Sequence, residues 1–281
     1  MADTLEVGIS TCPNDTFAFC GLLNGAITVP GVELSFELMD VQALNEAMRA
    51  GRFDLVKASF AAALPCAADY YVMPTGAALG HGVGPVLLSR ARGDGQELPP
   101  LSAARILVPG AGTTAAFLLR LFHPEATPAD SVVFSEILPA LQNAETDYGV
   151  CIHEGRFTYK ALGLSLIEDL GESWRQRTGL PLPLGGIFGR NSIDVELLRA
   201  FGRALKESID YARSHPVEAE TMMSAQAQEL DPPALWKHVE LYVNENTRDL
   251  GRSGRHALQV FATEAQSDAL LTAPGPFQFL D

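Results

Sequence analysis

The chain has 281 residues, of which 47% are hydrophobic and 19% are charged, and its formal net charge is −14. This composition is sufficient for a large core in one or two domains, and it excludes a disordered chain. An acidic surface repels phosphate backbones and anionic lipids, so we expect neither a nucleic-acid partner nor a membrane partner.

The N-terminal residues and the cysteines indicate the cellular compartment of the protein. No run approaches the ~20 apolar residues of a membrane span, and the first ten residues lack the basic and apolar segments of a signal peptide. The cysteines are scattered and indicate reduced thiols, with neither a disulfide framework nor a zinc site. They stand at positions 12, 20, 66 and 151. We therefore expect a cytoplasmic protein.

Three strands, each followed by a helix, are predicted in the first 69 residues. Pro13 cannot continue a strand ladder, and Asn14 or Asp15 can cap the helix that starts near Thr16. This order implies a largely parallel sheet with right-handed crossovers. The expected strands span 5–10, 32–39 and 53–60, and the expected helices span 16–24, 41–50 and 60–69.

A further strand is predicted at 83–91, and a second series of strands and helices starts after a polar Gly/Pro segment at 93–100. An apolar Pro/Gly segment at 181–188 suits a strand that returns between lobes, and the chain beyond it is nearly all helical. The expected strands span 83–91, 105–108, 132–135, 148–153 and 164–170, and the expected helices span 113–122, 136–143 and 172–177.

This element order predicts an α/β fold with two lobes, two mainly parallel sheets flanked by helices, and a helical C-terminal segment. It resembles the type II periplasmic binding proteins, whose ligands bind in the cleft between the lobes. We expect residues 1–92 and 188–281 to form lobe 1 and residues 93–187 to form lobe 2. The helical segment offers surfaces for a homodimer.

His153 is the first candidate for chemistry. It follows a short apolar run and precedes Gly155, so it stands where a strand gives way to a loop. Ligands of α/β proteins bind at the carboxyl ends of strands, and histidine transfers protons near neutral pH. The alternative, which is the more common for an isolated histidine, is a buried side chain hydrogen-bonded at a strand end. Of the other histidines only His81 is a candidate for the cleft; the rest favour structural roles.

Thr113 and Thr114 open a helix after the loop Pro109-Gly110-Ala111-Gly112. The first amides of a helix lack internal partners and carry partial positive charge, so this corner suits a carboxylate or phosphate. It is not a P-loop, because the Gly-Lys-Ser/Thr ending is absent. A plain threonine N-cap explains the same residues equally well.

Lys57-Ala58-Ser59 ends the third predicted strand, with Lys57 and Ser59 on one side of it. A lysine in so apolar a strand needs water or a partner, which favours a position in the cleft. A lysine that reaches solvent at the sheet end is the alternative. Cys12 lies in the first strand-to-helix turn, but nothing in the sequence pairs it with a base.

Five segments together resemble the 1,4-dihydroxy-6-naphthoate synthases, enzymes of the futalosine route to menaquinone. The run His-Glu-Gly-Arg-Phe-Thr-Tyr within 152–159 is specific, whereas Gly-Thr-Thr is weak alone. The segments are Ser-Thr-Cys-Pro-Asn-Asp-Thr-Phe at 10–17, Lys-Ala-Ser at 57–59, Gly-Thr-Thr at 112–114, Ile-His-Glu-Gly-Arg-Phe-Thr-Tyr at 152–159 and Leu-Pro-Leu-Gly-Gly-Ile at 182–187.

The resemblance implies a cytoplasmic carbon–carbon lyase that uses no cofactor and no metal. Its implied substrate is cyclic dehypoxanthine futalosine, a small anionic molecule, which yields 1,4-dihydroxy-6-naphthoate and a dihydroxyacetone-type fragment. Carried over by position, His153 is the catalytic base, and the substrate is bound by Lys57, Ala58, Ser59, Thr113 and Thr114.

Two other functions are compatible with this architecture. Chorismate dehydratase, from the same pathway, resembles this family in fold and size, but its members generally lack the His-Glu-Gly-Arg-Phe-Thr-Tyr run. A solute-binding protein without chemistry would also suit the fold, although the sequence shows no signal peptide or lipid anchor for transport.

Overall fold

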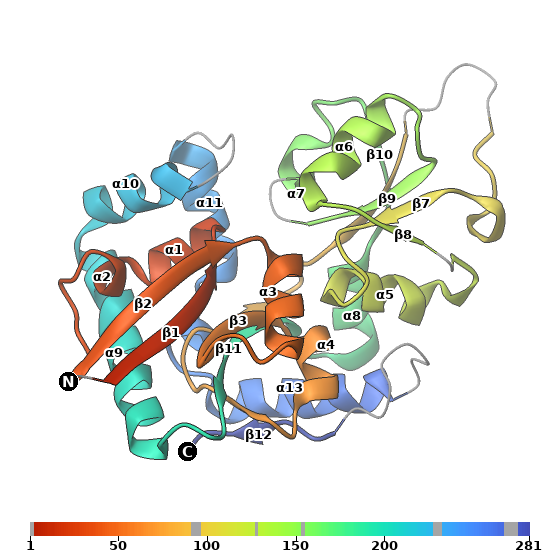
Figure 1. The fold of residues 1–281 in the computed structure, drawn as a ribbon. Helices are drawn as coiled ribbons and strands as arrows, with labels where there is room; N and C mark the ends of the chain where they lie inside the picture. The colour runs from red at the N-terminus through yellow and green to blue at the C-terminus, as the bar shows by residue number, and fades with distance from the viewer. Residues whose placement is uncertain (1–2, 91–96, 127–128, 153–154, 227–231, 267–274) are drawn as a thin grey trace.

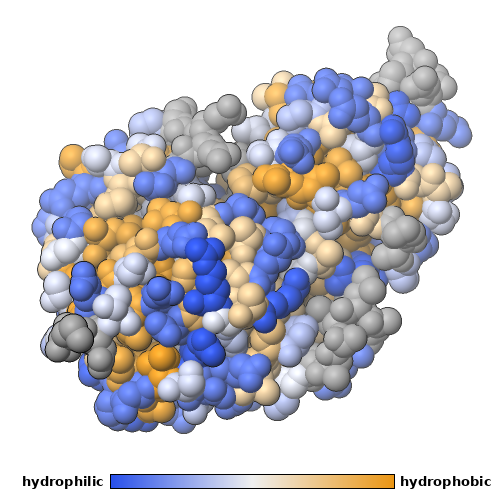
Figure 2. Space-filling view, in the orientation of Figure 1, coloured by the Kyte–Doolittle hydropathy of each residue, from blue (hydrophilic) through white to orange (hydrophobic). Residues whose placement is uncertain are grey.

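The computed structural model describes residues 3–90, 97–126, 129–152, 155–226, 232–266 and 275–281. Its strands form two sheets, which lie in two lobes that meet along one side, and both ends of the chain lie in the larger lobe (Figure 1). Hydrophilic and apolar residues are interspersed over the face that Figure 2 shows.

In the described residues, the first sheet has seven strands in the order β12-β4-β11-β3-β1-β2, with β5 paired to β11. β1 pairs in parallel with β2 and β3, whereas β11 runs antiparallel to β3, β4 and β5. The strands are β1 (Asp3–Ser10), β2 (Val32–Met39), β3 (Leu55–Ser59), β4 (Tyr70–Val72), β5 (Ala78–Gly80), β11 (Leu182–Arg190) and β12 (Gln278–Phe279).

The second sheet has five described strands in the order β10-β6-β9-β7-β8. β7 pairs in parallel with β8 and β9, whereas β6 is antiparallel to both β9 and β10. The strands are β6 (Val86–Ser89), β7 (Ile106–Val108), β8 (Asp130–Ser131), β9 (Tyr148–Cys151) and β10 (Ser165–Asp169).

Sheet membership refines two expectations. Each sheet is mixed, because β6 and β11 are the strands by which the chain passes between the lobes, and both pair in antiparallel fashion. β6 joins the second sheet although it precedes residue 93, and β11 joins the first sheet although it begins before residue 188. The lobe boundaries at 92/93 and 187/188 stay predictions. The sheets favour boundaries earlier in the chain, before β6 and before β11.

Helices cover the faces of both sheets (Figure 1). Several begin at an aspartate whose carboxylate accepts from the first-turn amides, as Asp40 and Asp194 do. The helices are α1 (Pro13–Ala18), α2 (Cys20–Leu23), α3 (Val41–Arg49), α4 (Phe60–Ala63), α5 (Thr114–Phe122), α6 (Phe134–Gln142), α7 (Gly155–Thr158), α8 (Leu170–Thr178), α9 (Val195–Ser214), α10 (Pro216–Gln226), α11 (Pro232–Tyr242), α12 (Glu245–Arg248) and α13 (Gly251–Ala265).

The predicted strand at 132–135 is wrong. The strand in this region is β8, and helix α6 already begins at Phe134. Ile137 and Leu141 stand one helical turn apart and are buried, and both lie close to Gly149 of β9. Burial of this helical stripe outweighs the strand preference of a short apolar run, which periodicity alone cannot assign.

One apolar cluster extends from the first lobe into the second. Phe117 of α5 packs edge-on against Phe261 of α13, with ring centroids 4.9 Å apart, and Trp174 of α8 contacts the same ring at 5.7 Å. The cluster also contains Phe60 and Phe188 of the first lobe. The C-terminal helix α13 therefore joins the lobes through shared core. None of the helices in the described ranges is long and apolar enough to cross a membrane.

Candidate functional site

A pocket between the two sheets collects residues from both lobes. Its empty space is about 730 Å³, part of it open to solvent, which is within the range of small-molecule sites. The lining residues come from the end of β1 and the start of α1, from α3, β3, β5, the segment before β6, the start of α5, the residue after β9, β11 and α11. They are Ser10, Cys12, Asn14, Asp15, Val41, Lys57, Ala58, Ser59, Ala78, Gly84, Pro85, Thr113, Thr114, Ala115, Ile152, Leu184, Gly185, His238 and Tyr242.

Lys57 lies in the pocket wall and forms a buried ion pair. Its Nζ atom is 2.7 Å from Oδ1 of Asp15, and it also donates to the carbonyl oxygen of Gly76 at 3.3 Å. The alternative interpretation, in which Lys57 reaches solvent at the end of the sheet, is therefore wrong, because its side chain is only 7% exposed. Burial raises the pKa of the Asp15 carboxyl above its ordinary value, and the Lys57 ammonium partly opposes that shift.

Ser59 lines the same pocket at the end of β3. Its backbone amide donates to Oδ1 of Asn45 at 2.9 Å, and its hydroxyl accepts from Nδ2 of Asn45 at 3.2 Å. Asn45 comes from the buried face of α3, and sequence reasoning did not single it out. An amide that pairs with both groups of Ser59 holds the end of the strand in one geometry.

The start of α5 forms the wall of the pocket from the second lobe. Thr113 is the N-cap: its hydroxyl accepts from the amide of Ala116 at 3.2 Å and donates to the carbonyl of Gly110 at 2.8 Å. The N-cap interpretation is thus confirmed for Thr113. The hydroxyl of Thr114 instead donates to the carbonyl of Leu184 on β11 at 3.1 Å, which joins the two lobes at the pocket.

The glycine loop before α5 lies against α3 of the other lobe. Gly110 has φ +111°, and a Cβ there would lie 2.2 Å from Oε1 of Gln42. At Gly112 a Cβ would lie 2.1 Å from Nη2 of Arg49. The absence of side chains lets the two lobes approach here, so that the threonines of one lobe face the lysine of the other.

His153 lies outside the described residues, so the position expected for the catalytic base has no structural account. Its neighbour in the sequence, Ile152, lines the pocket directly after β9. Helix α7 begins at Gly155, whose amide donates to the carbonyl of Ile152 at 3.2 Å. His81, the other histidine considered for the cleft, is 3.1 Å from Oδ1 of Asn246 and is not among the described residues that line this pocket.

Asn14, Asp15, His238 and Tyr242 are among the pocket residues that were not identified as site residues from the sequence. Asn14 and Asp15 were expected as helix caps, but the N-cap of α1 is Cys12 and both residues lie within the helix. His238 and Tyr242 come from α11, in a part of the chain where no motif was seen. Their spacing of four residues places them on one helix face, and that periodicity is the signal that sequence reasoning missed.

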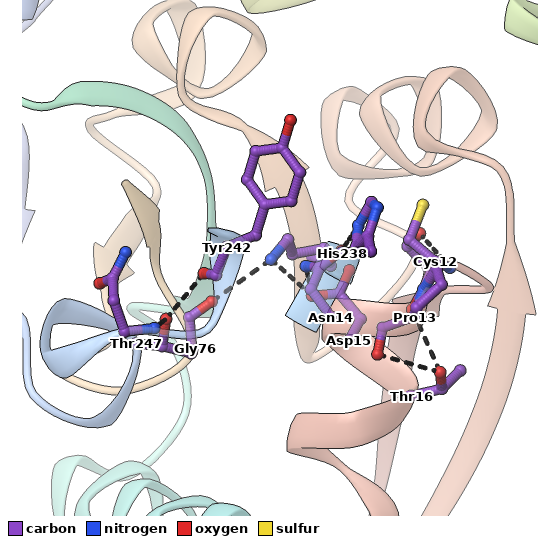
Figure 3. Close-up of polar contacts among 12 residues, drawn as sticks. Cys12, Pro13, Asn14, Asp15, Thr16, Gly76, His238, Tyr242 and Thr247 are labelled. Atoms are coloured by element: carbon purple, nitrogen blue, oxygen red, sulfur yellow. Dashed lines mark hydrogen bonds and ion pairs between the residues drawn. The ribbon is translucent and has the colours of Figure 1, made fainter. Parts of the chain in front are cut away.

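These residues form a connected group of polar contacts (Figure 3). Nε2 of His238 is 3.0 Å from Oδ1 of Asn14, and Nδ2 of Asn14 donates to Oδ1 of Asp15 at 2.9 Å. Asp15 in turn pairs with Lys57. The helical C-terminal segment is thereby tied to the first strand-to-helix turn, 224 residues away in sequence.

Although the chain is acidic overall, the pocket contains a lysine and an aspartate together with neutral polar side chains. One lysine, several residues with hydroxyl groups and the first residues of α5 line the pocket, and residues of these kinds suit an anionic ligand with polar substituents. In the described part of the chain, no cluster of three or more His, Cys, Asp or Glu side chains is placed to hold a metal ion.

A family model described as menaquinone biosynthesis matches residues 5–267. The chain belongs to this menaquinone biosynthesis family. The enzyme is 42% identical over 274 residues to 1,4-dihydroxy-6-naphthoate synthase of Thermus thermophilus, with 98% of each chain covered. It is 37% identical over 281 residues to the enzyme of the same name from Streptomyces coelicolor, with 98% of this chain and 97% of that one covered.

Solved structures of similar fold agree with the two-lobed architecture. Protein AF1704 from Archaeoglobus fulgidus superimposes with a TM-score of 0.88 at 30% identity, covering 95% of this chain and 98% of that one. The alkanesulfonate-binding protein SsuA from Xanthomonas axonopodis superimposes with a TM-score of 0.72 at 14% identity, covering 99% of this chain and 97% of that one. The second likeness concerns the fold alone, and it confirms the predicted resemblance to periplasmic binding proteins.

Proposed function

We propose that this menaquinone biosynthesis enzyme is a carbon–carbon lyase that converts cyclic dehypoxanthine futalosine into 1,4-dihydroxy-6-naphthoate and a dihydroxyacetone-type fragment. The observation that carries the proposal is one pocket in which Lys57 and Ser59 of one lobe face Thr113 and Thr114 of the other. The relatives with 42% and 37% identity, both named 1,4-dihydroxy-6-naphthoate synthase, support the reaction.

In this proposal Lys57, Ala58, Ser59, Thr113 and Thr114 bind the substrate. The Lys57 ammonium attracts an anionic ligand into a chain with net charge −14. The backbone amides in the first turn of a helix have no acceptor within the helix. In α5, the amide of Ala116 donates to the side chain of Thr113 instead. These donors suit a carboxylate or an oxygen that gains negative charge.

His153 is proposed as the general base. Cleavage of the retro-aldol type begins when a base removes a proton from the substrate, and a neutral imidazole can do so near neutral pH. The electrons of the broken bond move toward an oxygen, where the donors of the pocket stabilise the charge. Formation of the aromatic naphthalene ring favours the products. The step as written needs no resident cofactor, and the scattered cysteines support a cytoplasmic setting.

The test is turnover of cyclic dehypoxanthine futalosine by the purified protein, with naphthoate followed by absorbance and mass, beside His153→Ala. We expect product from wild type, and a loss of about 10² to 10⁴ in turnover in the variant while substrate binding is largely kept. Binding without product in either protein would favour a solute-binding function. Turnover of chorismate instead would favour the dehydratase, and normal turnover by His153→Ala would remove this residue from the mechanism.

A further inference from the structure

Tyr242 presents a buried phenol to the pocket from the last turn of α11. The residue is only 7% exposed and is one of the lining residues. In Figure 3 its ring points away from the dashed contacts that join Asn14, Asp15 and His238, with the hydroxyl at the far end. No hydrogen bond to this hydroxyl is formed by any residue in the described part of the chain.

The ring is held in place although its hydroxyl has no hydrogen bond to a described residue. The His238 ring lies beside it with centroids 4.7 Å apart, and His238 is itself anchored at 3.0 Å to Asn14. The backbone carbonyl of Tyr242 accepts from the hydroxyl of Thr247 at 3.1 Å. A ring fixed by its neighbours, with a hydroxyl that no described residue engages, is an arrangement that prepares a contact before the ligand arrives.

The phenol keeps its proton over the whole physiological range. Burial raises the pKa of Tyr242 to about 12, and the nearby Arg156 guanidinium opposes this shift only in part. A phenol with so high a pKa does not act as a base near neutral pH, but it donates a hydrogen bond.

We propose that the Tyr242 hydroxyl donates a hydrogen bond to a substrate oxygen that gains negative charge during cleavage. This inference rests on the proposed lyase function and adds a catalytic residue from the C-terminal helical segment. It also explains why α11 is tied to the β1–α1 turn through Asn14 and His238: the contact sets the position of the donor. The bond strengthens as charge grows on the oxygen, so it acts on turnover more than on binding.

The experiment compares wild type with Tyr242→Phe for kcat and KM on cyclic dehypoxanthine futalosine. Phenylalanine keeps the ring and its contact with His238 and removes only the hydroxyl. We expect kcat to fall by about 10²-fold with KM changed by less than about threefold, as for loss of one donor to a developing charge. Thermal unfolding near neutral pH should be unchanged, because the hydroxyl has no bond to a described residue.

The matched control is Tyr70→Phe. Tyr70 is also buried, but its hydroxyl donates to the carbonyl of Met48 at 2.9 Å, and the residue is not among those that line the pocket. We expect its melting temperature to fall by about 2–4 °C while kcat is kept. If Tyr242→Phe has the kcat of an active wild type, or changes KM alone, the inference is wrong although the lyase function stands. If wild type makes no naphthoate, the lyase function and this inference both fail.

Discussion

The Nζ atom of Lys57 lies 2.7 Å from Oδ1 of Asp15, and both side chains are more than nine-tenths buried in the wall of the pocket. The two residues are 42 positions apart in sequence, on β3 and α1. A buried ammonium without a partner is strongly unfavourable, so Asp15 is what allows Lys57 to stand beside a ligand. The ion pair thus links a proposed substrate-binding residue to an aspartate for which the sequence indicated only a helix-capping role.

Asp15→Asn is expected to destabilise the fold by about 3–5 kcal/mol, because it leaves the buried Lys57 charge without its counter-ion. Urea unfolding near neutral pH measures this. The control is Glu37→Gln, which breaks the Arg52–Glu37 pair on the surface, where the side chains are 49% and 43% exposed. That change should cost less than about 1 kcal/mol. Equal losses in the two variants would show that the buried pair does not stabilise the fold.

The burial of Tyr242 predicts a pH dependence of stability at high pH. Its pKa is about 12 in the fold, against about 10 for a tyrosine in the unfolded chain. The unfolded state therefore ionises first, and stability falls as pH rises from about 10 towards 12, by about 2.7 kcal/mol at most. Tyr242→Phe lacks this loss.

Urea unfolding of wild type and Tyr242→Phe at pH 8.5, 10 and 11 tests this expectation. The difference in free energy of unfolding between the two proteins should be constant below pH about 9 and should shift in favour of the variant above pH about 10. A difference that is independent of pH would mean that the phenol is not shielded in the fold.

Thr113→Ala removes the N-cap of α5 and is expected to cost about 1 kcal/mol of stability. It should also lower kcat/KM, because the first turn of α5 faces the pocket. Asp194→Ala is the control: Asp194 caps α9 through the amides of Glu196 and Leu197 and is not among the described residues of the pocket. That variant should lose similar stability and keep kcat/KM. A parallel fall of kcat/KM in both would assign the effect to stability alone.

Gly110→Ala tests the close approach of the two lobes. At φ +111° an alanine is strained, and its Cβ would lie 2.2 Å from Oε1 of Gln42. We expect a loss of about 2–3 kcal/mol and lower turnover, because the loop carries Thr113. Gly25→Ala is the matched control, with φ +78° and no atom within 4 Å of the new Cβ. It should cost about 1 kcal/mol and leave activity unchanged, and equal effects would mean that the lobe contact is unimportant.

Much of the fold follows from local patterns in the chain. The strand at 32–39 and the helices at 41–49 and 114–122 were predicted almost to the residue. Each has strong periodicity or a good cap, which act within a few residues. The strand expected at 132–135 was wrong because burial against Gly149, a distant neighbour, decided that segment.

Sequence patterns were enough to predict the α/β fold with two lobes and to select Lys57, Ser59 and the two threonines at 113 and 114 as candidates. Those conclusions depend on spacing, turn residues and resemblance, all of which are local properties of the chain. The pairing of Asp15 with Lys57, and the contact between Asn14 and His238 across 224 residues, became visible in the folded structure. Long-range pairing is set by which buried polar groups can satisfy one another, and no short pattern records that requirement.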